Sequence, residues 1–347
     1  MVSWRELRDN PRARQLLEQR WLILRLVREW FWSRNFAEVQ TPLAVRHAGQ
    51  EPYLNPVSLT LQDAAGAPYP LQLHTSPEYS LKKLLAAGFP RIFEITKTFR
   101  DGEDIRGLHH PEFTLLEWYR APGTLAELMD DTEGLFKAIG EKLGAPTVGI
   151  SGESTSVKGA WKKKTMRALW QEWLDADLNN LLTREALAEF ARARGYAVTA
   201  GDAYEDIFFK IFLDKIEPRL GREAPLFVYD YPSQMASLSR LSPRDPRYAE
   251  RFELYIGGVE IANAFGELLD AEEQLRRLEA DQAHRQKLGK PTWAVDQDFI
   301  AALRSGIPAP AAGIALGIDR MVLLFTGARG IEEVIFHTLG DQWEQQN

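Results

Sequence analysis

Four residues with side chains suited to binding a charged substrate are gathered in the segment 91–120. Apolar and polar residues alternate at both of its ends, which predicts two β-strands, at 92–100 and 113–120. The intervening loop contains glycines and a proline, which favour turns over helix. One face gathers a fixed cation, an aromatic ring, a carboxylate and a phenol: Arg100, Phe113, Glu117 and Tyr119. An ordinary core strand does not carry this set; a solvated polar face is the alternative.

The segment 251–270 carries a second set of polar residues in a sequence that otherwise reads as strand. Its three carboxylates belong to Glu253, Glu260 and Glu267. Asn263 and Phe265 share a face with Glu267, whereas Glu260 needs a β-bulge to join them, for which 257–258, a glycine pair, is a candidate. Carboxylates gathered in this way repel one another, so a divalent metal, an ammonium ligand or both should lie between them. The alternative is an exposed acidic strand.

A third segment, 311–328, is rich in small residues and predicts a short strand, a turn at Gly317 and an apolar helix opened by Asp319 and Arg320. An arginine at a helix start gains nothing from the helix dipole, so Arg320 needs an anionic partner. A phosphate is favoured over a structural salt bridge.

Ser76 and Glu78 flank Pro77 at the start of a further predicted helix. Glu78 can simply favour the helix dipole, or it can point into a pocket as a counter-ion.

The elements that must position these residues are predicted from periodicity and capping signals. Helices are expected at 10–34, 77–87, 124–144, 165–175, 183–194, 203–216, 270–289 and 296–306. Further strands are expected at 36–42, 71–74 and 226–231. The polar segment 146–164, with its lysine run at 162–164, is expected to be a mobile loop.

Length, charge and composition exclude several classes of protein. The 347 residues can bury a core, and no run approaches the ~20 apolar residues of a membrane span. The N-terminus lacks the apolar core of a secretion signal. The absence of cysteine excludes disulfides and thiolate metal sites, and it fits a cytoplasmic protein. The net charge of −7 excludes a general nucleic-acid-binding surface.

Together, and in this order, three segments resemble the signature motifs of class II aminoacyl-tRNA synthetases. FAEVQTP at 36–42 resembles motif 1, which lies at the dimer interface in that family. FRDGED and HHPEFTLLEWY resemble motif 2, and GIALGIDR resembles motif 3. The resemblance implies an α+β fold, with a mainly antiparallel β-sheet flanked by helices, over the single domain 1–347. It also implies a homodimer.

Within this class, SPE at 76–78 and EIANAFGEL at 260–268 look like lysyl-tRNA synthetase. The chain is expected to lack the N-terminal OB-fold that binds the anticodon. This short form resembles the elongation factor P–lysine lysyltransferase family, which attaches a lysine-type amino acid, preferably (R)-β-lysine, to a lysine of elongation factor P. That family also has an alanine at the position of Ala315, where lysyl-tRNA synthetases have the middle glycine of motif 3. In the family, this alanine reshapes the amino-acid pocket.

The resemblance implies roles in forming an aminoacyl-adenylate from ATP. Arg100 would hold the α-phosphate and Arg320 the γ-phosphate, making these two the catalytic residues. Phe113 would stack on adenine, with Arg320 on the other side. Glu253 and Glu260 would hold magnesium (Mg²⁺). The implied ATP-binding residues are Arg100, Glu103, His110, Phe113, Glu260, Ile261, Gly317 and Arg320.

For the amino acid, lysine or (R)-β-lysine, the resemblance implies a pocket whose acidic residues receive the ammonium groups. Its residues would be Ser76, Glu78, Glu117, Tyr119, Asn263, Phe265, Glu267 and Ala315. An amine of elongation factor P must lose a proton before it attacks the adenylate, and no base is identified.

The loop of motif 2 departs from the family, because FRDGED and LHHPEF replace FRNE and HNPEF. Glu103 is favoured as the ATP contact, with Asp101 and Asp104 left open. His110 replaces an asparagine that contacts ATP in the family, and His109 is expected to be structural.

Two alternatives remain. One is a truncated lysyl-tRNA synthetase-like enzyme acting on tRNA or a small amine, which the missing anticodon module and the net charge disfavour. The other is a non-catalytic regulatory paralogue, which the presence of Arg100, Arg320 and the acidic pair disfavours.

Overall fold

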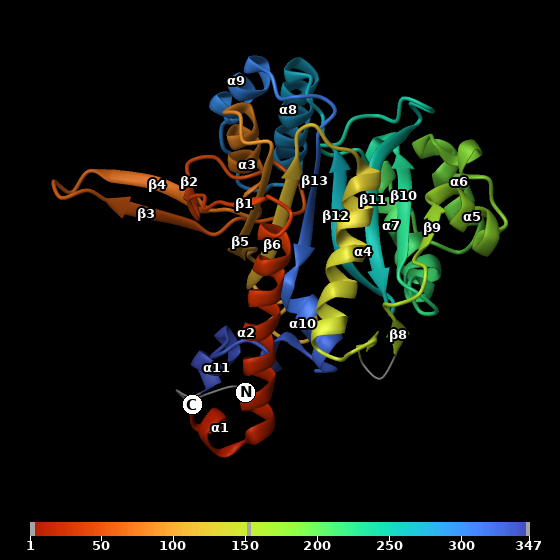
Figure 1. Ribbon diagram of the computed structural model, residues 1–347. Coiled ribbons are helices and arrows are strands. Elements are labelled where there is room, and N and C mark those ends of the chain that lie inside the picture. The colour runs from red at the N-terminus through yellow and green to blue at the C-terminus, as the bar shows by residue number, and fades with distance from the viewer. Residues whose placement is uncertain (1–3, 151–153, 345–347) are drawn as a thin grey trace.

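The computed structural model describes residues 4–150 and 154–344. An eight-stranded sheet forms the centre of the molecule (Figure 1). Its strands follow the order β1 (Ala37–Glu38), β5 (Arg91–Phe99), β6 (Glu112–Arg120), β13 (Ala312–Gly317), β12 (Val259–Gly266), β11 (Tyr248–Ile256), β10 (Leu226–Pro232) and β9 (Lys162–Thr165). The two outermost strands pair parallel with their neighbours and all other pairs are antiparallel. The α+β prediction is therefore confirmed.

One face of the sheet is covered by three helices, α2 (Pro11–Trp32), α4 (Leu125–Lys142) and α10 (Ile318–Thr326). The alternation of β6 explains this, because Leu116 and Trp118 are fully buried in the same hydrophobic cluster as side chains of these helices. Leu115, Glu117 and Tyr119 consequently point to the opposite face, where a cavity lies. The strand predicted at 113–120 thus separates core residues from candidate site residues.

A second group of helices, α3 (Glu78–Ala86), α8 (Ala271–Lys287) and α9 (Gln297–Ser305), packs together at one end of the sheet. Their shared hydrophobic cluster includes Tyr79 and Phe299, whose rings stack at 4.5 Å between centroids. This cluster holds the start of α3 beside the sheet, which places Ser76 and Glu78 at the cavity.

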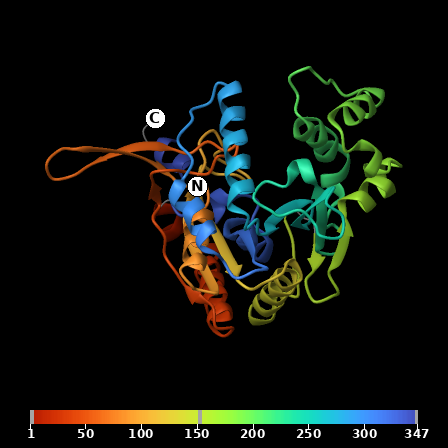
Figure 2. The same cartoon turned by 90° about the horizontal axis from the view of Figure 1, so that it is seen from above.

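A third cluster lies at the β9–β10 edge and contains the helices of residues 166–216 (Figure 2, green). They are α5 (Met166–Leu174), α6 (Arg184–Ala193) and α7 (Tyr204–Ile211), which continues as a π-helix over Phe212–Ile216. Short 3₁₀ turns occupy Leu178–Leu181, Glu217–Arg219, Ser233–Met235 and Ile331–Glu333. Because α7 lines the cavity with Glu205 and Phe209, this cluster forms one of its walls.

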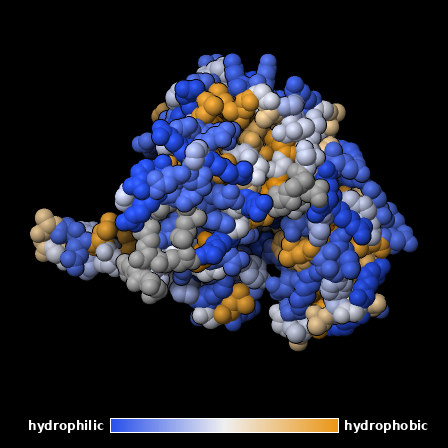
Figure 3. Space-filling view, turned by 90° about the horizontal axis from the view of Figure 1, so that it is seen from below, coloured by the Kyte–Doolittle hydropathy of each residue, from blue (hydrophilic) through white to orange (hydrophobic). Residues whose placement is uncertain are grey.

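A hairpin of β3 (Ser58–Gln62) and β4 (Pro68–Leu73) projects away from the body, and β2 (Ala44–Val45) pairs with β4 (Figure 1). Helices α1 (Trp4–Asp9) and α11 (Leu339–Glu344) lie at the same end of the molecule, near the described termini (Figure 1). The surface seen from below is mainly hydrophilic, with small separate apolar patches (Figure 3).

Two sequence predictions are wrong in detail. The segment 146–164, expected as a loop, contains β7 (Thr147–Val148), β8 (Thr155–Ser156) and the start of β9. Its residues 151–153 lie outside the described part. The lysines of β9 are in strand because β10 provides a parallel partner for their backbone, and Lys162 and Lys164 pair with Glu223 and Glu172.

The segment 251–270 is a hairpin rather than one strand. Gly257 and Gly258 form its two-residue turn with φ of 64° and 82°, a conformation that glycine adopts without strain. The predicted bulge exists, but it lies at Ile261, where the pairing shifts from Leu254↔Ala262 to Tyr255↔Glu260. This shift turns Glu260 toward the same cavity as Asn263.

The helix starts predicted at Asn10 and Thr124 are confirmed by their caps, whereas α3 begins after Pro77 without a side-chain cap hydrogen bond. Asn10 Oδ1 accepts the amide of Arg12 at 3.0 Å, and Thr124 and Glu127 form a capping box at α4. Within residues 4–150 and 154–344, no helix is long and apolar enough to cross a bilayer.

Candidate active site

A cavity of about 590 Å³ lies on the sheet face opposite α2 and α4. It is lined by nearly all the residues that the sequence nominated: Ser76, Glu78, Arg100, Glu103, His110, Phe113, Glu117, Glu253, Glu260, Ile261, Asn263, Phe265, Ala315, Gly317 and Arg320. Tyr119 and Glu267 are the two nominated residues that do not line it. Both are almost wholly buried behind its wall.

Strand register explains why residues distant in sequence meet in this cavity. Ala315 on β13 pairs with Asn263 on β12 and with Glu117 on β6. On the other side of β6, Phe113 pairs with Thr98 on β5, so Arg100 follows just beyond the end of that strand. Residues of β6, β13, β12 and β11 line the cavity, so its floor is built from four adjacent strands that hold their side chains at fixed spacings.

Arg100 provides a cation at one end of the cavity. Its guanidinium lies 5.0 Å from the ring centroid of Phe113, and its buried Nε has no hydrogen-bond partner. Burial lowers the pKa of Arg100, and the positive charge of Arg320 lowers it further. A buried arginine nitrogen without a partner is costly, and an anionic ligand would satisfy it.

Arg320 lies nearby at the start of α10. Its Nη1 donates to the backbone oxygen of Glu260 at 2.7 Å, and its nearest carboxylate oxygen, Oε2 of Glu260, lies 3.9 Å away. The neighbouring residue, Asp319, has a structural position: it accepts from Arg20 Nη1 at 2.6 Å and from the amide of Thr114 at 2.7 Å. This buried contact ties α10 to α2 and β6 and so holds Arg320 beside the motif 2 hairpin.

Glu117 provides a buried carboxylate at the other end. Its oxygens accept from the hydroxyl of Ser76 at 2.6 Å and from that of Tyr119 at 2.9 Å. Burial, followed by the charge of Glu78, raises the pKa of Glu117 to about 8 despite these hydrogen bonds. A cationic ligand would favour its ionised form. Tyr119 thus acts behind the cavity wall, by orienting Glu117.

Lys82 was not among the site residues predicted from the sequence. Its fully buried Nζ lies 2.5 Å from Oε1 of Glu78 and 2.5 Å from Oε2 of Glu267. Burial lowers the pKa of Lys82, but the charges of Glu267 and Glu78 outweigh it and the net shift is upward. The other oxygen of Glu267, Oε1, has no hydrogen-bond partner. The available signal was the i,i+4 spacing from Glu78.

Glu253 and Glu260 form the acidic pair nominated for a metal. Glu253 accepts from the hydroxyls of Tyr231 and Tyr255 at 2.6 and 2.5 Å and from Arg251 at 2.7 Å. Burial, followed by the charge of Glu253, raises the pKa of Glu260 to about 7. Oxygen ligands and this unrelieved charge fit a hard divalent cation. Among the described residues, no group of three or more His, Cys, Asp or Glu could hold one, so the remaining ligands would come from a substrate or from water.

Both loop histidines line the cavity, but their side chains differ in what they bond to. His110 is buried, and its ring nitrogens bond to the backbone: Nε2 accepts from the amide of Leu339 at 3.2 Å, so the Nδ1 hydrogen faces the Glu112 oxygen at 2.7 Å. His109, expected to be structural, faces the cavity between Glu103, at 3.1 Å, and Arg320, at 3.4 Å. Sequence could not resolve this, because adjacent loop residues carry no periodicity.

The choice among the three loop acids can also be compared with the structure. Glu103 lines the cavity, whereas Asp101 and Asp104 are exposed and do not. Further charged residues line the cavity without having been nominated: Glu51, Glu205, Glu217, Arg251 and Asp281.

Comparisons with known proteins agree with this geometry. The chain matches the family model for class II tRNA synthetases (D, K and N) over residues 2–339. It is similar to the elongation factor P–(R)-β-lysine ligase of Haemophilus influenzae, at 37% identity over 314 residues that cover 90% of this chain and 91% of the relative. The ligase of that name from Yersinia enterocolitica is 36% identical over 329 residues, 93% of this chain and 95% of the relative. The chain therefore belongs to the class II tRNA synthetase family.

Proposed function

We propose that the protein is an ATP-dependent ligase that activates a lysine-type amino acid, (R)-β-lysine in preference to lysine, and transfers it to a lysine of elongation factor P. The observation that carries this proposal is one cavity with the half-buried Arg100, whose buried Nε has no partner, at one end and the buried carboxylate of Glu117 at the other. The first suits a phosphate and the second an ammonium. Relatives that are 36–37% identical in sequence over nine-tenths of the chain are named elongation factor P–(R)-β-lysine ligase.

In the first step, the amino acid's carboxylate attacks the α-phosphorus of ATP, forming an acyl–phosphate bond as pyrophosphate leaves. The nucleophile is already ionised, so the chain must supply orientation and charge neutralisation. We assign Arg100 to the α-phosphate and Arg320 to the γ-phosphate. Phe113 would stack on the adenine, and Glu103 and His109 would contact the nucleotide from the loop. Ile261 and Gly317 would line the nucleotide's site.

We assign His110 to the nucleotide site through the shape that it gives the loop, because both of its ring nitrogens already bond to the backbone.

Glu253 and Glu260 would hold Mg²⁺ together with the ATP phosphates. When bound, the ion would neutralise charge on the phosphates. Tyr231, Tyr255 and Arg251 hold Glu253 in position, while burial and the charge of Glu253 raise the pKa of Glu260.

The amino acid's ammonium groups would face the acidic end. Glu117, oriented by Ser76 and Tyr119, would accept one of them. Glu78 would contribute its second oxygen, since Lys82 occupies the first. Glu267 lies behind the cavity wall and would act indirectly, by holding Lys82 in position beside Glu78. Asn263, Phe265 and Ala315 would shape the pocket for the aliphatic part.

The protein would act as a homodimer in the cytoplasm, where ATP and translation factors are found, with tRNA a poor acceptor. The test combines pyrophosphate exchange with acceptor labelling. Amino-acid-dependent exchange between pyrophosphate and ATP, together with label from (R)-β-lysine on elongation factor P, is the expected result. Exchange without any labelled protein, but with labelled tRNA, would contradict the proposal.

A further inference from the structure

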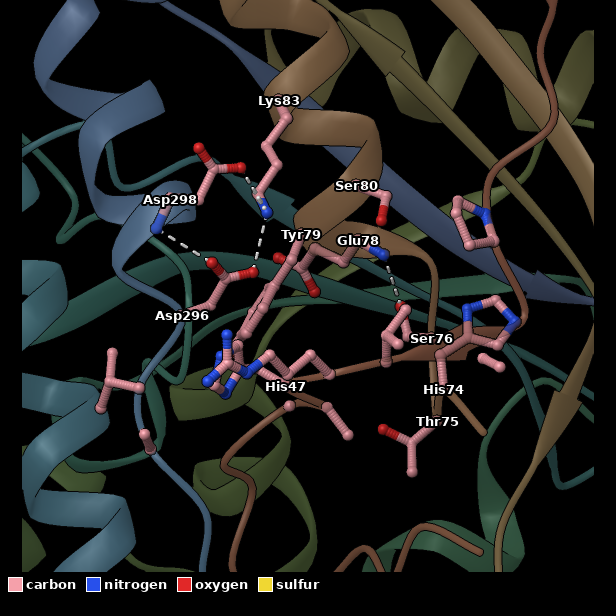
Figure 4. Close-up of a pocket in the computed structure, with 18 of the residues that line it drawn as sticks. His47, His74, Thr75, Ser76, Glu78, Tyr79, Ser80, Lys83, Asp296 and Asp298 are labelled. Atoms are coloured by element: carbon pink, nitrogen blue, oxygen red, sulfur yellow. Dashed lines mark hydrogen bonds and ion pairs between the residues drawn. The ribbon is translucent and has the colours of Figure 1, made fainter. Parts of the chain in front are cut away.

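A second cavity, of about 700 Å³, adjoins the first. Glu51, Ser76 and Glu78 line both, so the two cavities meet at the acidic end of the active site. Its other walls come from the segment 42–49, which contains β2, from the first turns of α3 and from the segment 294–298 that leads into α9. Figure 4 looks onto this cavity, with Lys83 bonded to Asp296 and Asp298 at one rim and Glu78 beside Ser76.

Three buried polar atoms in this lining have no hydrogen-bond partner: Nδ1 of His47, Oε2 of Glu51 and the hydroxyl oxygen of Tyr79. Tyr79 is 9% exposed. A buried polar group without a partner costs free energy, so three of them around one cavity indicate a ligand that supplies the missing contacts. All three atoms can accept a hydrogen bond, and a primary ammonium has three N–H donors.

The charge of the lining agrees with a cation. Four carboxylates, from Glu51, Glu78, Asp296 and Asp298, face two cationic side chains, those of Arg46 and Lys83. Burial raises the pKa of Glu51, and the charge of Glu78 raises it further, so the opposing charges of Arg100 and Arg285 only partly offset the cost of burying this carboxylate. The carboxylate of Glu51 folds back onto Gly49, where a Cβ would meet its Oε2 at 2.1 Å, so glycine is needed to hold it there.

We propose that this second cavity is the channel through which the acceptor enters: it takes the extended ammonium-bearing side chain of a lysine and delivers its nitrogen to the first cavity past Ser76 and Glu78. This rests on the proposed function. A lysine side chain is thin and long, so it can pass between the segment 42–49 and α3 while the protein that carries it stays outside. Asp298, whose side chain is 82% exposed, marks the outer rim.

The sharpest variant is Tyr79→Phe. It removes only the hydroxyl and keeps the ring that stacks on Phe299. Tyr79 lines the second cavity and not the first. Tyr204→Phe is the matched control, because the hydroxyl of Tyr204 is also buried and unpartnered but lines neither cavity. Glu51→Gln tests the charge at the junction.

The experiment measures KM for elongation factor P and amino-acid-dependent pyrophosphate exchange in each variant. We expect Tyr79→Phe and Glu51→Gln to raise the KM for elongation factor P at least about fivefold relative to Tyr204→Phe. A fivefold change corresponds to about 1 kcal/mol, the contribution of one hydrogen bond. Pyrophosphate exchange in Tyr79→Phe should stay within about twofold of exchange in Tyr204→Phe.

Equal acceptor KM in Tyr79→Phe and Tyr204→Phe, or a parallel loss of exchange in Tyr79→Phe, would overturn the channel while leaving the proposed function intact. Failure of the unmodified enzyme to label elongation factor P would overturn both.

Discussion

Lys82 Nζ lies 2.5 Å from Oε2 of Glu267, and both side chains are almost wholly buried. The same nitrogen reaches Glu78, so one internal cation holds two of the acids of the candidate amino-acid pocket. It reduces the negative charge that this end of the cavity presents to a substrate. It also fixes one oxygen of each acid, which leaves the second oxygen of Glu78 to face a ligand, because Glu78 lines the cavity and Glu267 does not.

Replacing Lys82 with methionine should therefore destabilise the protein strongly. The variant keeps the length of the side chain but leaves two buried carboxylates without their cation. The free energy of unfolding, measured in urea, should fall by about 3–5 kcal/mol. The exposed Lys287, replaced in the same way, should cost less than about 1 kcal/mol. Adding Glu267→Gln to Lys82→Met should restore part of the loss; equal losses in the Lys82 and Lys287 variants would refute the role.

Arg100→Ala should lower the rate of pyrophosphate exchange at least about a hundredfold, because the charge that develops at the α-phosphate loses its cationic partner. Arg100→Lys should also be strongly impaired, since a lysine cannot reproduce the planar fork. Arg304→Ala, which breaks an exposed ion pair with Glu272, is the control and should retain exchange. Full exchange in Arg100→Ala would exclude the assignment.

The affinity for the amino acid should depend on pH through Glu117. Its pKa is about 8 without ligand, so below that pH the free enzyme holds a neutral acid. An ammonium ligand needs the carboxylate, and binding therefore releases a proton. KM for the amino acid should fall as pH rises from about 6 to 8, by up to tenfold per pH unit, and then level off.

Steady-state exchange at a series of pH values checks this, and Glu117→Gln should have a high KM with no such slope. A KM in the unmodified enzyme that is flat across this range would contradict the role of Glu117.

Asp319→Asn should loosen the attachment of α10. The substitution leaves Arg20 buried beside a neutral amide and weakens the contact with the backbone of Thr114. Thermal and urea unfolding should show a loss of about 3 kcal/mol. Asp245→Asn, at an exposed surface ion pair, should change stability by less than about 1 kcal/mol. If the two variants unfold alike, the buried pair does not stabilise the junction.

Much of the fold could be predicted because local signals decide it. The caps at Asn10 and Thr124 and the alternation of β5 and β6 depend on neighbouring residues only, and each is found in the structure. The lysine run at 162–164 could not be assigned, because its strand exists only through pairing with β10, some sixty residues later.

The site shows the same division. Residue types and motif order nominated the lining of the cavity, but not the partners that hold it. Tyr119 and Glu267 act from behind the wall, and Lys82 joins two acids that are far apart in sequence. Such contacts follow from packing between elements. The orientation of His109 and His110 is set in the same way, by backbone groups as distant as Leu339.

The central claim is that a protein, rather than an RNA, receives the activated amino acid. The most direct test is a competition in one reaction containing the enzyme, ATP, Mg²⁺, labelled (R)-β-lysine, elongation factor P and lysine tRNA. Mass spectrometry and gel analysis would follow the label. We predict that the label appears on a lysine side chain of elongation factor P and increases its mass by one β-lysyl group. Label confined to the tRNA, with the factor unmodified, would contradict the claim.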